Sequence, residues 1–321
     1  MIFLLILLLL ALVFGGGFYA YRIAFYNPPA DPDKAPNMDG SVYEPYREEI
    51  IRMYRAIRDR ECEAVTIYSD DGLKLYGRYY HVRDGAPLDI CFHGYRSRAF
   101  TDFAGGSELS FEMGHNLLLV DQRAHGRSEG RTISFGIRER WDVLSWIDYA
   151  CRRFGNDTSI LLYGVSMGAA TVLMASGLDL PPNVKGIVAD CPYSRPLDII
   201  LHVGKTNPLP QWLIRIFAIL GAKIYGGFDL LEADAAEAVS HSNVPILVIH
   251  GESDTFVPPV MSEIYHPLVK RVTFPGAGHA LSFLSDTPRY KQIIRDFSYN
   301  LLRSLPYMGE MAPIIQYDIT L

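Results

Sequence analysis

Cysteine is scarce in this sequence, and its few copies stand apart from one another. The four are Cys62, Cys91, Cys151 and Cys191. No two of them form a CxxC pair, and no histidines follow at zinc-finger spacing. The pattern therefore indicates neither a dense disulfide framework nor a structural zinc site. We expect free thiols and no bound metal.

An excess of basic residues is also lacking. The chain carries 30 Lys and Arg against 36 Asp and Glu, which gives a net charge of -6. Without a broad basic surface to meet phosphates, nucleic-acid binding is not expected. The 321 residues are 49% hydrophobic, and this size and composition predict one large core rather than a disordered chain.

Charged residues are absent from the start of the chain up to Arg22. The run MIFLLILLLLALVFGGGFYAY is long enough to cross a bilayer as a helix, and Tyr19 and Tyr21 lie where interfacial aromatics are common. A cleaved signal peptide is the alternative, but no Lys or Arg precedes the run, and Phe18 occupies a position where cleavage needs a small residue. We therefore expect residues 1–22 to form a single-pass membrane anchor, with the side of the membrane left open.

Proline and aspartate are concentrated in the stretch that follows. The segment NPPADPDKAPNMDGSVY, from Asn27 to Tyr43, cannot hold a helix and is typical of a linker. We therefore place a linker at residues 23–43, a folded body at 44–304 and a C-terminal tail without a functional signal at 305–321.

Short apolar runs give the body its rhythm. An alternating segment turns at Asp71 and Gly72, a strong hairpin signal. Six continuous apolar runs follow, separated by amphipathic segments, which is typical of a parallel sheet covered by helices on both faces. The runs are LDICF, NLLLVD, ILLYG, KGIVAD, PILVIH and RVTFPG. The sequence predicts an α/β fold with an antiparallel hairpin followed by five or six parallel strands.

One connection is longer than two neighbouring strands require. Residues 194 to about 243 include QWLIRIFAILGAKIYGGF, a strongly apolar segment with helical character. We expect this insertion to form a helical cap over one edge of the sheet. A plain helical crossover is the alternative.

The short segment GVSMG supplies a candidate nucleophile. Gly164 and Gly168 flank Ser166 where an apolar strand is expected to become a helix of small residues. Such a turn is too tight for side chains at the glycine positions, and it exposes the serine above the sheet edge. A random chain of this length contains G-x-S-x-G roughly one time in ten. Much of the support for Ser166 as a nucleophile therefore comes from the strand and helix expected on either side of it.

Partners for this serine follow in the order Ser, acid, His. Asp254 comes after the run PILVIH, and His279 stands in a glycine-rich loop after the next run. Loops that follow parallel strands open on the same edge, so His279 can act as the base and Asp254 can orient it. The backbone N–H groups of Tyr95 and Met167 are the candidate oxyanion donors.

Alternatives to these assignments also stand at strand ends. Asp190 ends the run KGIVAD and is the second candidate for the acid. The histidines at 93, 125 and 250 each precede a glycine in an expected turn, and we expect them to stabilise those turns. Cys191 is expected to pack rather than to act as a nucleophile.

The segments HGYRS, DQRAHGRSEG, GVSMG, HGESD and GAGH together resemble the α/β-hydrolase superfamily, close to its monoglyceride-lipase-like and serine-peptidase-like esterase branch. The resemblance extends from about Glu61 to Leu302. It implies an eight-stranded, mostly parallel sheet and no cofactor. It also implies Ser166 as nucleophile, His279 as base and Asp254 as acid, with Tyr95 and Met167 as oxyanion donors.

The expected function is therefore two-step acyl transfer by a serine hydrolase. A membrane anchor and an apolar cap favour an ester with a medium or long acyl group, so we expect a small ester or lipid as the substrate. Aminopeptidase or thioesterase activity is the alternative within the same chemistry. A non-catalytic binding protein of the same fold is the alternative outside it. The oligomeric state is left open.

Overall fold

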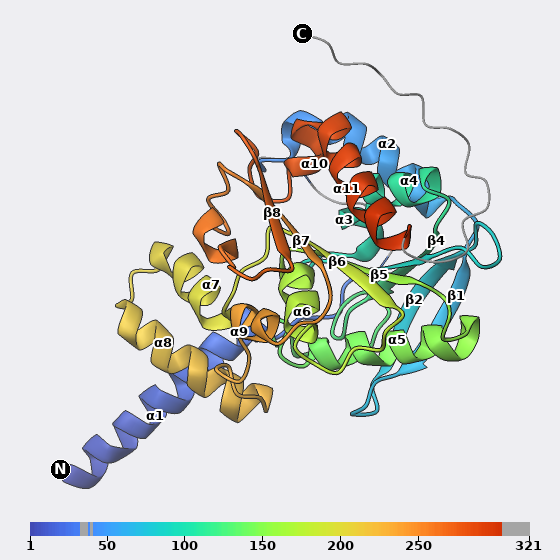
Figure 1. Ribbon diagram of the computed structural model, residues 1–321. Coiled ribbons are helices and arrows are strands. Elements are labelled where there is room, and N and C mark those ends of the chain that lie inside the picture. Colours follow the sequence, from blue (N-terminus) through green and yellow to red (C-terminus); the bar gives the residue numbers. More distant parts are fainter. Residues whose placement is uncertain (33–37, 39–40, 304–321) are drawn as a thin grey trace.

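An eight-stranded sheet forms the centre of the protein in a computed structural model that describes residues 1–32, 38 and 41–303 (Figure 1). Its spatial order is β1-β2-β4-β3-β5-β6-β7-β8. The strands are β1 (Glu63–Tyr68), β2 (Lys74–Tyr80), β3 (Leu88–Phe92), β4 (Asn116–Asp121), β5 (Ile160–Val165), β6 (Val184–Asp190), β7 (Ile246–Gly251) and β8 (Val269–Phe274).

The pairing of the strands confirms the predicted α/β-hydrolase fold. β2 pairs antiparallel with both β1 and β4, and every pair from β4 through β8 is parallel. The strands β3, β4 and β7 are buried at every position, as their unbroken apolar runs require when helices cover both faces. The six apolar runs therefore became the six parallel strands.

Helices cover the two faces of the sheet as separate layers (Figure 1). Leu118 and Val120 of β4 point into the core beneath α5 and α6, whereas Leu117 and Leu119 point into the core beneath α2, α3 and α4. The layer with α5 (Glu139–Phe154) and α6 (Met167–Ala175) also holds α9 (Ala235–Ser240). The opposite layer holds α2 (Arg47–Arg58), α3 (Ala99–Asp102), α4 (Ala104–Glu112), α10 (Ser282–Ser285) and α11 (Thr287–Leu302).

The insertion at 194–243 divides into two parts. Its last helix, α9, packs closely on the end of α6, where a Cβ on Gly177 would lie 2.8 Å from the backbone of Ala238, so α9 serves as the crossover to β7. Before it come α7 (Pro196–Val203), the 3-10 turn η3 (Gly204–Thr206), α8 (Gln211–Leu220) and the π-helical turn η4 (Gly221–Gly226). These elements extend sideways from the sheet and meet the N-terminal helix (Figure 1).

The N-terminal segment does not stand apart from the body as the predicted linker boundary at residue 23 implied. Helix α1 (Ile2–Ala20) continues into the π-helical turn η1 (Tyr21–Phe25). The Phe25 ring is fully buried and packs against Phe135 and Phe228 in edge-to-face geometry. Its carbonyl accepts a hydrogen bond from the N–H of Ile133 at 2.7 Å. The start of the expected linker is thus part of the core, and the predicted tail at 305–321 lies outside the described residues.

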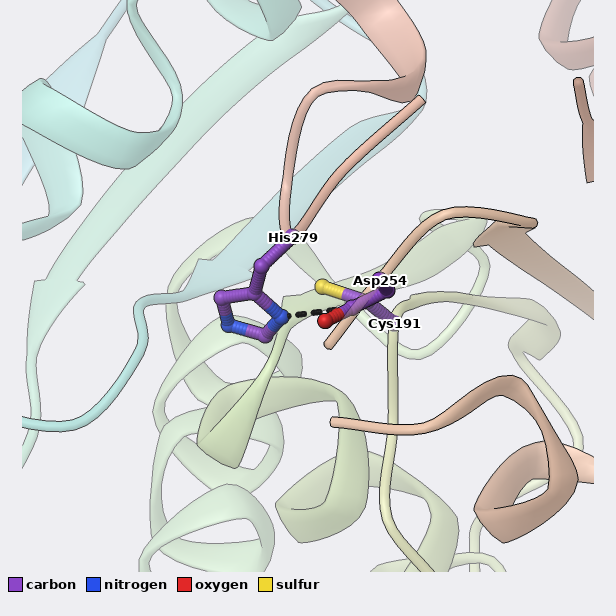
Figure 2. Close-up of side chains that lie close together, drawn as sticks. All are labelled: Cys191, Asp254 and His279. Carbon is purple, nitrogen blue, oxygen red and sulfur yellow. Dashed lines mark hydrogen bonds and ion pairs between the residues drawn. The ribbon is translucent and has the colours of Figure 1, made fainter. Parts of the chain in front are cut away.

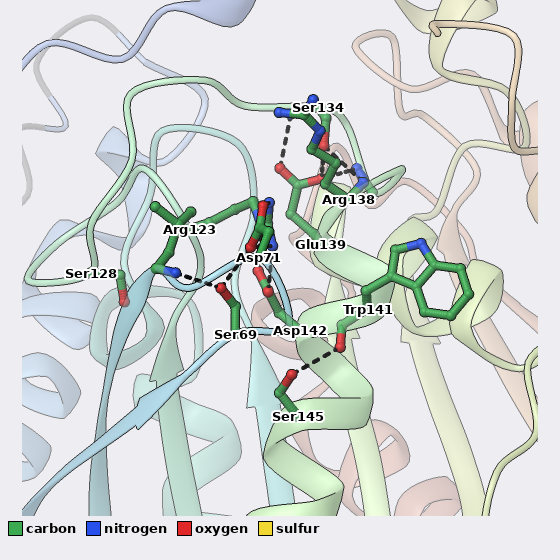
Figure 3. Close-up of polar contacts among 12 residues, drawn as sticks. Ser69, Asp71, Arg123, Ser128, Ser134, Arg138, Glu139, Trp141, Asp142 and Ser145 are labelled. Atoms are coloured by element: carbon green, nitrogen blue, oxygen red, sulfur yellow. Dashed lines mark hydrogen bonds and ion pairs between the residues drawn. The ribbon is translucent and has the colours of Figure 1, made fainter. Parts of the chain in front are cut away.

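Buried charged side chains stabilise the loop that follows β4 (Figure 3). The Arg123 guanidinium donates to Asp142 of α5 and to Asp71 in the hairpin turn. Glu139 accepts from the hydroxyl and the N–H of Ser134. Because a charged hydrogen bond is stronger than a neutral one when buried, these contacts fix the loop, and with it His125, beyond the carboxyl end of β4.

Candidate active site

The nucleophile candidate sits on a strained turn between β5 and α6. Ser166 has φ 55° and ψ −114°, a conformation that an L-residue holds only when its surroundings enforce it. A Cβ on Gly164 would lie 2.3 Å from the carbonyl oxygen of Gly168, and one on Gly168 would lie 1.9 Å from that of Phe92. Both glycines of GVSMG are therefore required by close backbone approach, as predicted.

His279 lies between the serine and an acid. Its Nε2 is 3.0 Å from Ser166 Oγ, and its Nδ1 is 2.7 Å from Asp254 Oδ2; the second contact is drawn in Figure 2. A carboxylate can only accept, so Nδ1 carries the proton and Nε2 is free to accept from the serine hydroxyl. The structure thus brings the three predicted side chains into one hydrogen-bonded chain.

Asp254 is held in its charged form. Its Oδ1 accepts from the N–H groups of Phe256 and Val257, and its Oδ2 also lies 3.3 Å from His250 Nε2. Burial alone would raise the pKa of Asp254, but the contacts from His250, His279 and the Val257 amide outweigh it and lower the pKa to about 2. A carboxylate that stays ionised can orient an imidazole and stabilise its protonated form.

Asp190, the second candidate for the acid, faces a different partner. Its Oδ2 accepts from the Tyr290 hydroxyl at 3.0 Å, and its backbone carbonyl accepts from the N–H of Ser166 at 2.8 Å. Burial raises the pKa of Asp190 to about 6. Because the Nδ1 of His279 is engaged by Asp254, the geometry favours Asp254 as the orienting acid.

The two candidate oxyanion donors belong to segments that pass close to Ser166. Met167 is the first residue of α6, so its N–H belongs to the helix start that has no carbonyl partner within the helix. The loop carrying Tyr95 passes so close that a Cβ on Gly94 would lie 3.4 Å from Ser166 Cβ. Asp102 holds this loop by accepting from the N–H of Gly94 at 2.7 Å and from the Ser97 hydroxyl.

The same loop is tied to the end of the N-terminal helix, which the sequence did not suggest. The Tyr95 hydroxyl donates to the carbonyl of Ala24 at 2.8 Å. Arg96 Nη2 donates to the carbonyls of Ile23 and Tyr26 at 2.7 and 2.9 Å. On the other side, the N–H of Arg96 donates to His125. His125 thus stabilises a turn, as predicted, and does so beside the candidate oxyanion hole.

A cavity of about 720 Å³ opens beside Ser166 and His279. Its walls come mainly from the layer with α2, α3, α4, α10 and α11. Apolar side chains from these helices include Ile50, Met53, Phe103, Leu109, Phe283 and Ile294. None of the described residues that line it belongs to the insertion at 194–243, so the expected cap forms no wall of this cavity.

Residues of the predicted linker take part in the cavity instead. Met38 and Tyr43 both line it, and Met38 is only 3% exposed. Burial, together with the nearby Asp102 carboxylate, raises the pKa of the Tyr43 hydroxyl. No apolar periodicity marked this segment, so its place could be found only from the fold.

Cys191, Asp254 and His279 offer three potential metal ligands within 4.8 Å of one another (Figure 2). Burial raises the pKa of the Cys191 thiol well above its usual value, whereas metals bind the thiolate. The Nδ1 of His279 already carries the proton shared with Asp254. The arrangement is therefore better explained by the hydrogen-bonded chain than by a metal centre.

Known proteins with the same fold resemble this one over most of its length. The esterase Pf2001 from Pyrococcus furiosus superposes with a TM-score of 0.65 at 21% identity, covering 86% of this chain and 98% of that one. The uncharacterized protein YqkD from Bacillus subtilis is 24% identical over 255 residues, 78% of this chain and 83% of that protein.

Two further matches each cover less than half of the chain. The thiohydrolase apmlB from Arthrinium phaeospermum is 33% identical over 140 residues, which is 42% of this chain and 44% of that protein. Residues 90–230, which include the GVSMG turn, match the family model described as alpha/beta hydrolase fold, and the order of the strands agrees with that description. The protein therefore has the α/β-hydrolase fold.

Proposed function

We propose that this protein is a serine hydrolase that cleaves carboxylic esters through an acyl-enzyme. The observation that carries the proposal is the hydrogen-bonded chain from Ser166 through His279 to Asp254 at the mouth of an apolar cavity. A nucleophile within reach of a base that is itself oriented by a third group is the arrangement that acyl transfer needs.

In the first half of the reaction, His279 Nε2 takes the proton of Ser166 as Oγ bonds to the carbonyl carbon. The oxyanion accepts from the N–H groups of Tyr95 and Met167, and His279 then gives its proton to the leaving alkoxide as the ester bond breaks. In the second half, water loses a proton to His279 and attacks the acyl-enzyme. Collapse of that intermediate releases the acid and restores the serine.

The cavity supports an ester with an apolar acyl group. Its lining is dominated by aliphatic and aromatic side chains, which bury hydrocarbon favourably. Two carboxyl groups reach it, Asp102 and Asp190, but burial raises the pKa of each. Groups that resist ionisation hold a free ammonium poorly, so the aminopeptidase alternative is less favoured.

Thioesters are the second candidate substrate. The specific support is the 33% identity over 140 residues to a protein named a thiohydrolase. The same acyl-enzyme can form from a thioester, with a thiolate as the leaving group.

The proposal includes membrane anchoring by α1. Phe3–Phe25 forms the one helix of the described chain that is long and apolar enough to cross a membrane, and only 7% of its apolar window is buried. The part of this helix that precedes the π-helical turn, Ile2–Ala20, extends about 28 Å, which is close to the thickness of a hydrocarbon core. Removal as a signal peptide would strip away Gly16 and Gly17, which pack against the insertion, so an uncleaved anchor is favoured.

The test uses the full chain in detergent or lipid nanodiscs. We would measure labelling by a fluorophosphonate probe and hydrolysis of p-nitrophenyl esters and acyl thioesters of increasing chain length. Ser166→Ala should abolish labelling and lower turnover at least about a thousand-fold. Ser253→Ala, which changes an exposed serine next to Asp254, is the matched control.

Two outcomes would count against the proposal. Labelling that survives in Ser166→Ala would mean another nucleophile, and a folded wild-type protein that neither labels nor hydrolyses any ester or thioester would favour a binding protein.

A second variant tests whether the cavity holds the acyl group. Met53→Trp should fill the cavity and shift the preferred chain length downward. An unchanged preference would place the acyl group elsewhere.

A further inference from the structure

One face of the insertion is apolar and uncovered. Trp212 is 63% exposed, Ile216 of the same helix is 42% exposed and Ile224 of η4 is 45% exposed. The exposed Arg215 and Lys223 lie on the same stretch of chain. A tryptophan and aliphatic residues interleaved with basic ones are typical of a helix that lies at a membrane surface.

Helix α8 lies against α1 (Figure 1). Glycines of α1 and of the following turn η4 allow this close contact. A Cβ on Gly16 would lie 2.4 Å from the Phe217 ring, and one on Gly221 would lie 2.6 Å from the carbonyl oxygen of Gly17. The Tyr225 hydroxyl donates to the carbonyl of Phe14 at 3.1 Å. Because each contact involves a particular residue of α1, the contacts fix the position of α8 along the axis of α1.

That position along α1 corresponds to the edge of the hydrocarbon core of a bilayer. From Ile2 the helix rises about 21 Å to Gly16 and about 29 Å to Tyr21, against a hydrocarbon core about 30 Å thick. If α1 spans the core, the stretch from Gly16 to Tyr21 occupies its last several ångströms. Anything packed beside that stretch lies at the same depth.

We propose that α8 and η4 lie in the membrane interface beside α1, with Trp212, Ile216 and Ile224 against lipid and with Arg215 and Lys223 toward headgroup phosphates. The inference rests on the proposed anchoring by α1. It adds a second point of attachment, and two points fix the tilt of the body over the membrane, whereas a single helix leaves the body free to swing. A second copy of the chain could cover the same face, and the test below separates the two.

The test compares two tryptophans in the full chain. The protein is reconstituted in vesicles of phosphatidylcholine with phosphatidylserine, in which part of the phosphatidylcholine carries brominated acyl chains that quench nearby indoles. Trp141→Phe leaves Trp212 as the exposed indole, and Trp212→Phe leaves Trp141, which is 43% exposed on α5, as the matched control. Trp146 is buried and common to both.

We expect bromine to quench the Trp141→Phe protein at least about twice as strongly as the Trp212→Phe protein. Flotation of the vesicles first reports whether the protein is membrane-bound at all. Protein that fails to float would overturn the anchor and this inference with it. Protein that floats, but in which both variants are quenched alike, would leave the anchor standing and overturn the placement of α8; cross-linking of Trp212 faces between copies would then identify the dimer instead.

Discussion

Asp190 is the last residue of β6 and Asp254 follows the neighbouring strand β7, and the two residues are 5% and 3% exposed. Asp254 receives two backbone N–H groups and the imidazoles of His250 and His279, and its pKa falls to about 2. Asp190 receives one hydroxyl from Tyr290, and its pKa rises to about 6.

The difference shows that the hydrogen-bond donors around each carboxyl act together with its burial to decide its charge at this edge. Burial pushes both pKa values upward, and only the carboxyl with several donors remains an anion. Only that anion can support a protonated imidazole during acyl transfer. Asp190 also leaves one buried oxygen, Oδ1, without a partner among the described residues, so ionising it is costly.

The largest expected effect tests the roles of the two carboxyls. Asp254→Asn should lower kcat/KM for an active ester by about 10³- to 10⁴-fold, because the amide favours the wrong imidazole tautomer. Asp190→Asn, the matched control, should change it less than about tenfold. Steady-state kinetics on both variants measure the contrast. Equal losses would mean that both groups serve the imidazole.

The second prediction concerns stability against pH, where the two groups have opposite signs. The raised pKa of Asp190 means that the native state holds its proton more tightly than the unfolded chain does. Its contribution to unfolding free energy is therefore greatest at low pH and falls by about 3 kcal/mol as pH rises from about 4 to above 6. The lowered pKa of Asp254 stabilises the fold by about 2 kcal/mol above pH 4, and this is lost as pH falls toward 2.

Denaturant unfolding at several pH values measures these slopes. Relative to wild type, Asp190→Asn should gain stability between pH 4 and pH 7, and Asp254→Asn should lose its stability difference from wild type below pH 3. A flat difference for Asp190→Asn across this range would show that Asp190 has an ordinary pKa.

The smallest expected effect comes from removing the single donor of Asp190. Tyr290→Phe should raise the pKa of Asp190 further, because the hydroxyl stabilises the anion, and should cost about 1 kcal/mol at neutral pH. The midpoint of the pH-dependent loss of stability should move upward while kcat/KM stays within about threefold. Tyr80→Phe, which removes a buried hydroxyl that donates to the carbonyl of Ile57, is the control and should leave the midpoint in place.

Much of the sheet topology and the positions of Ser166, Asp254 and His279 could be predicted from the sequence. Unbroken apolar runs mark strands buried on both faces, and loops after parallel strands meet at one edge whatever the intervening helices do. The meeting of these loops at one edge predicted that Ser166, His279 and Asp254 would lie together. The structure brings the three side chains within hydrogen-bonding distance.

Other features depend on tertiary contacts that no local pattern records. Arg96, Cys191 and Ala280 each adopt positive φ in the loops around Ser166, although none is a glycine, so propensity gave no sign of these turns. The pocket walls come from α2 and its neighbours rather than from the apolar insertion. The charge state of Asp190 depends on Tyr290, which is 100 residues away in the chain.

The end of the N-terminal helix is built into the catalytic domain. Carbonyls at residues 23, 24 and 26 receive Tyr95 and Arg96, and Phe25 fills the core. Cutting the chain after Asn27, by a protease or by gene truncation, would remove these acceptors and leave a hole where the ring had been. If α1 anchors the protein as proposed, a form released by cutting after Asn27 would lack the contacts that order the loop beside Ser166, and we expect it to be a poorer catalyst than the anchored chain.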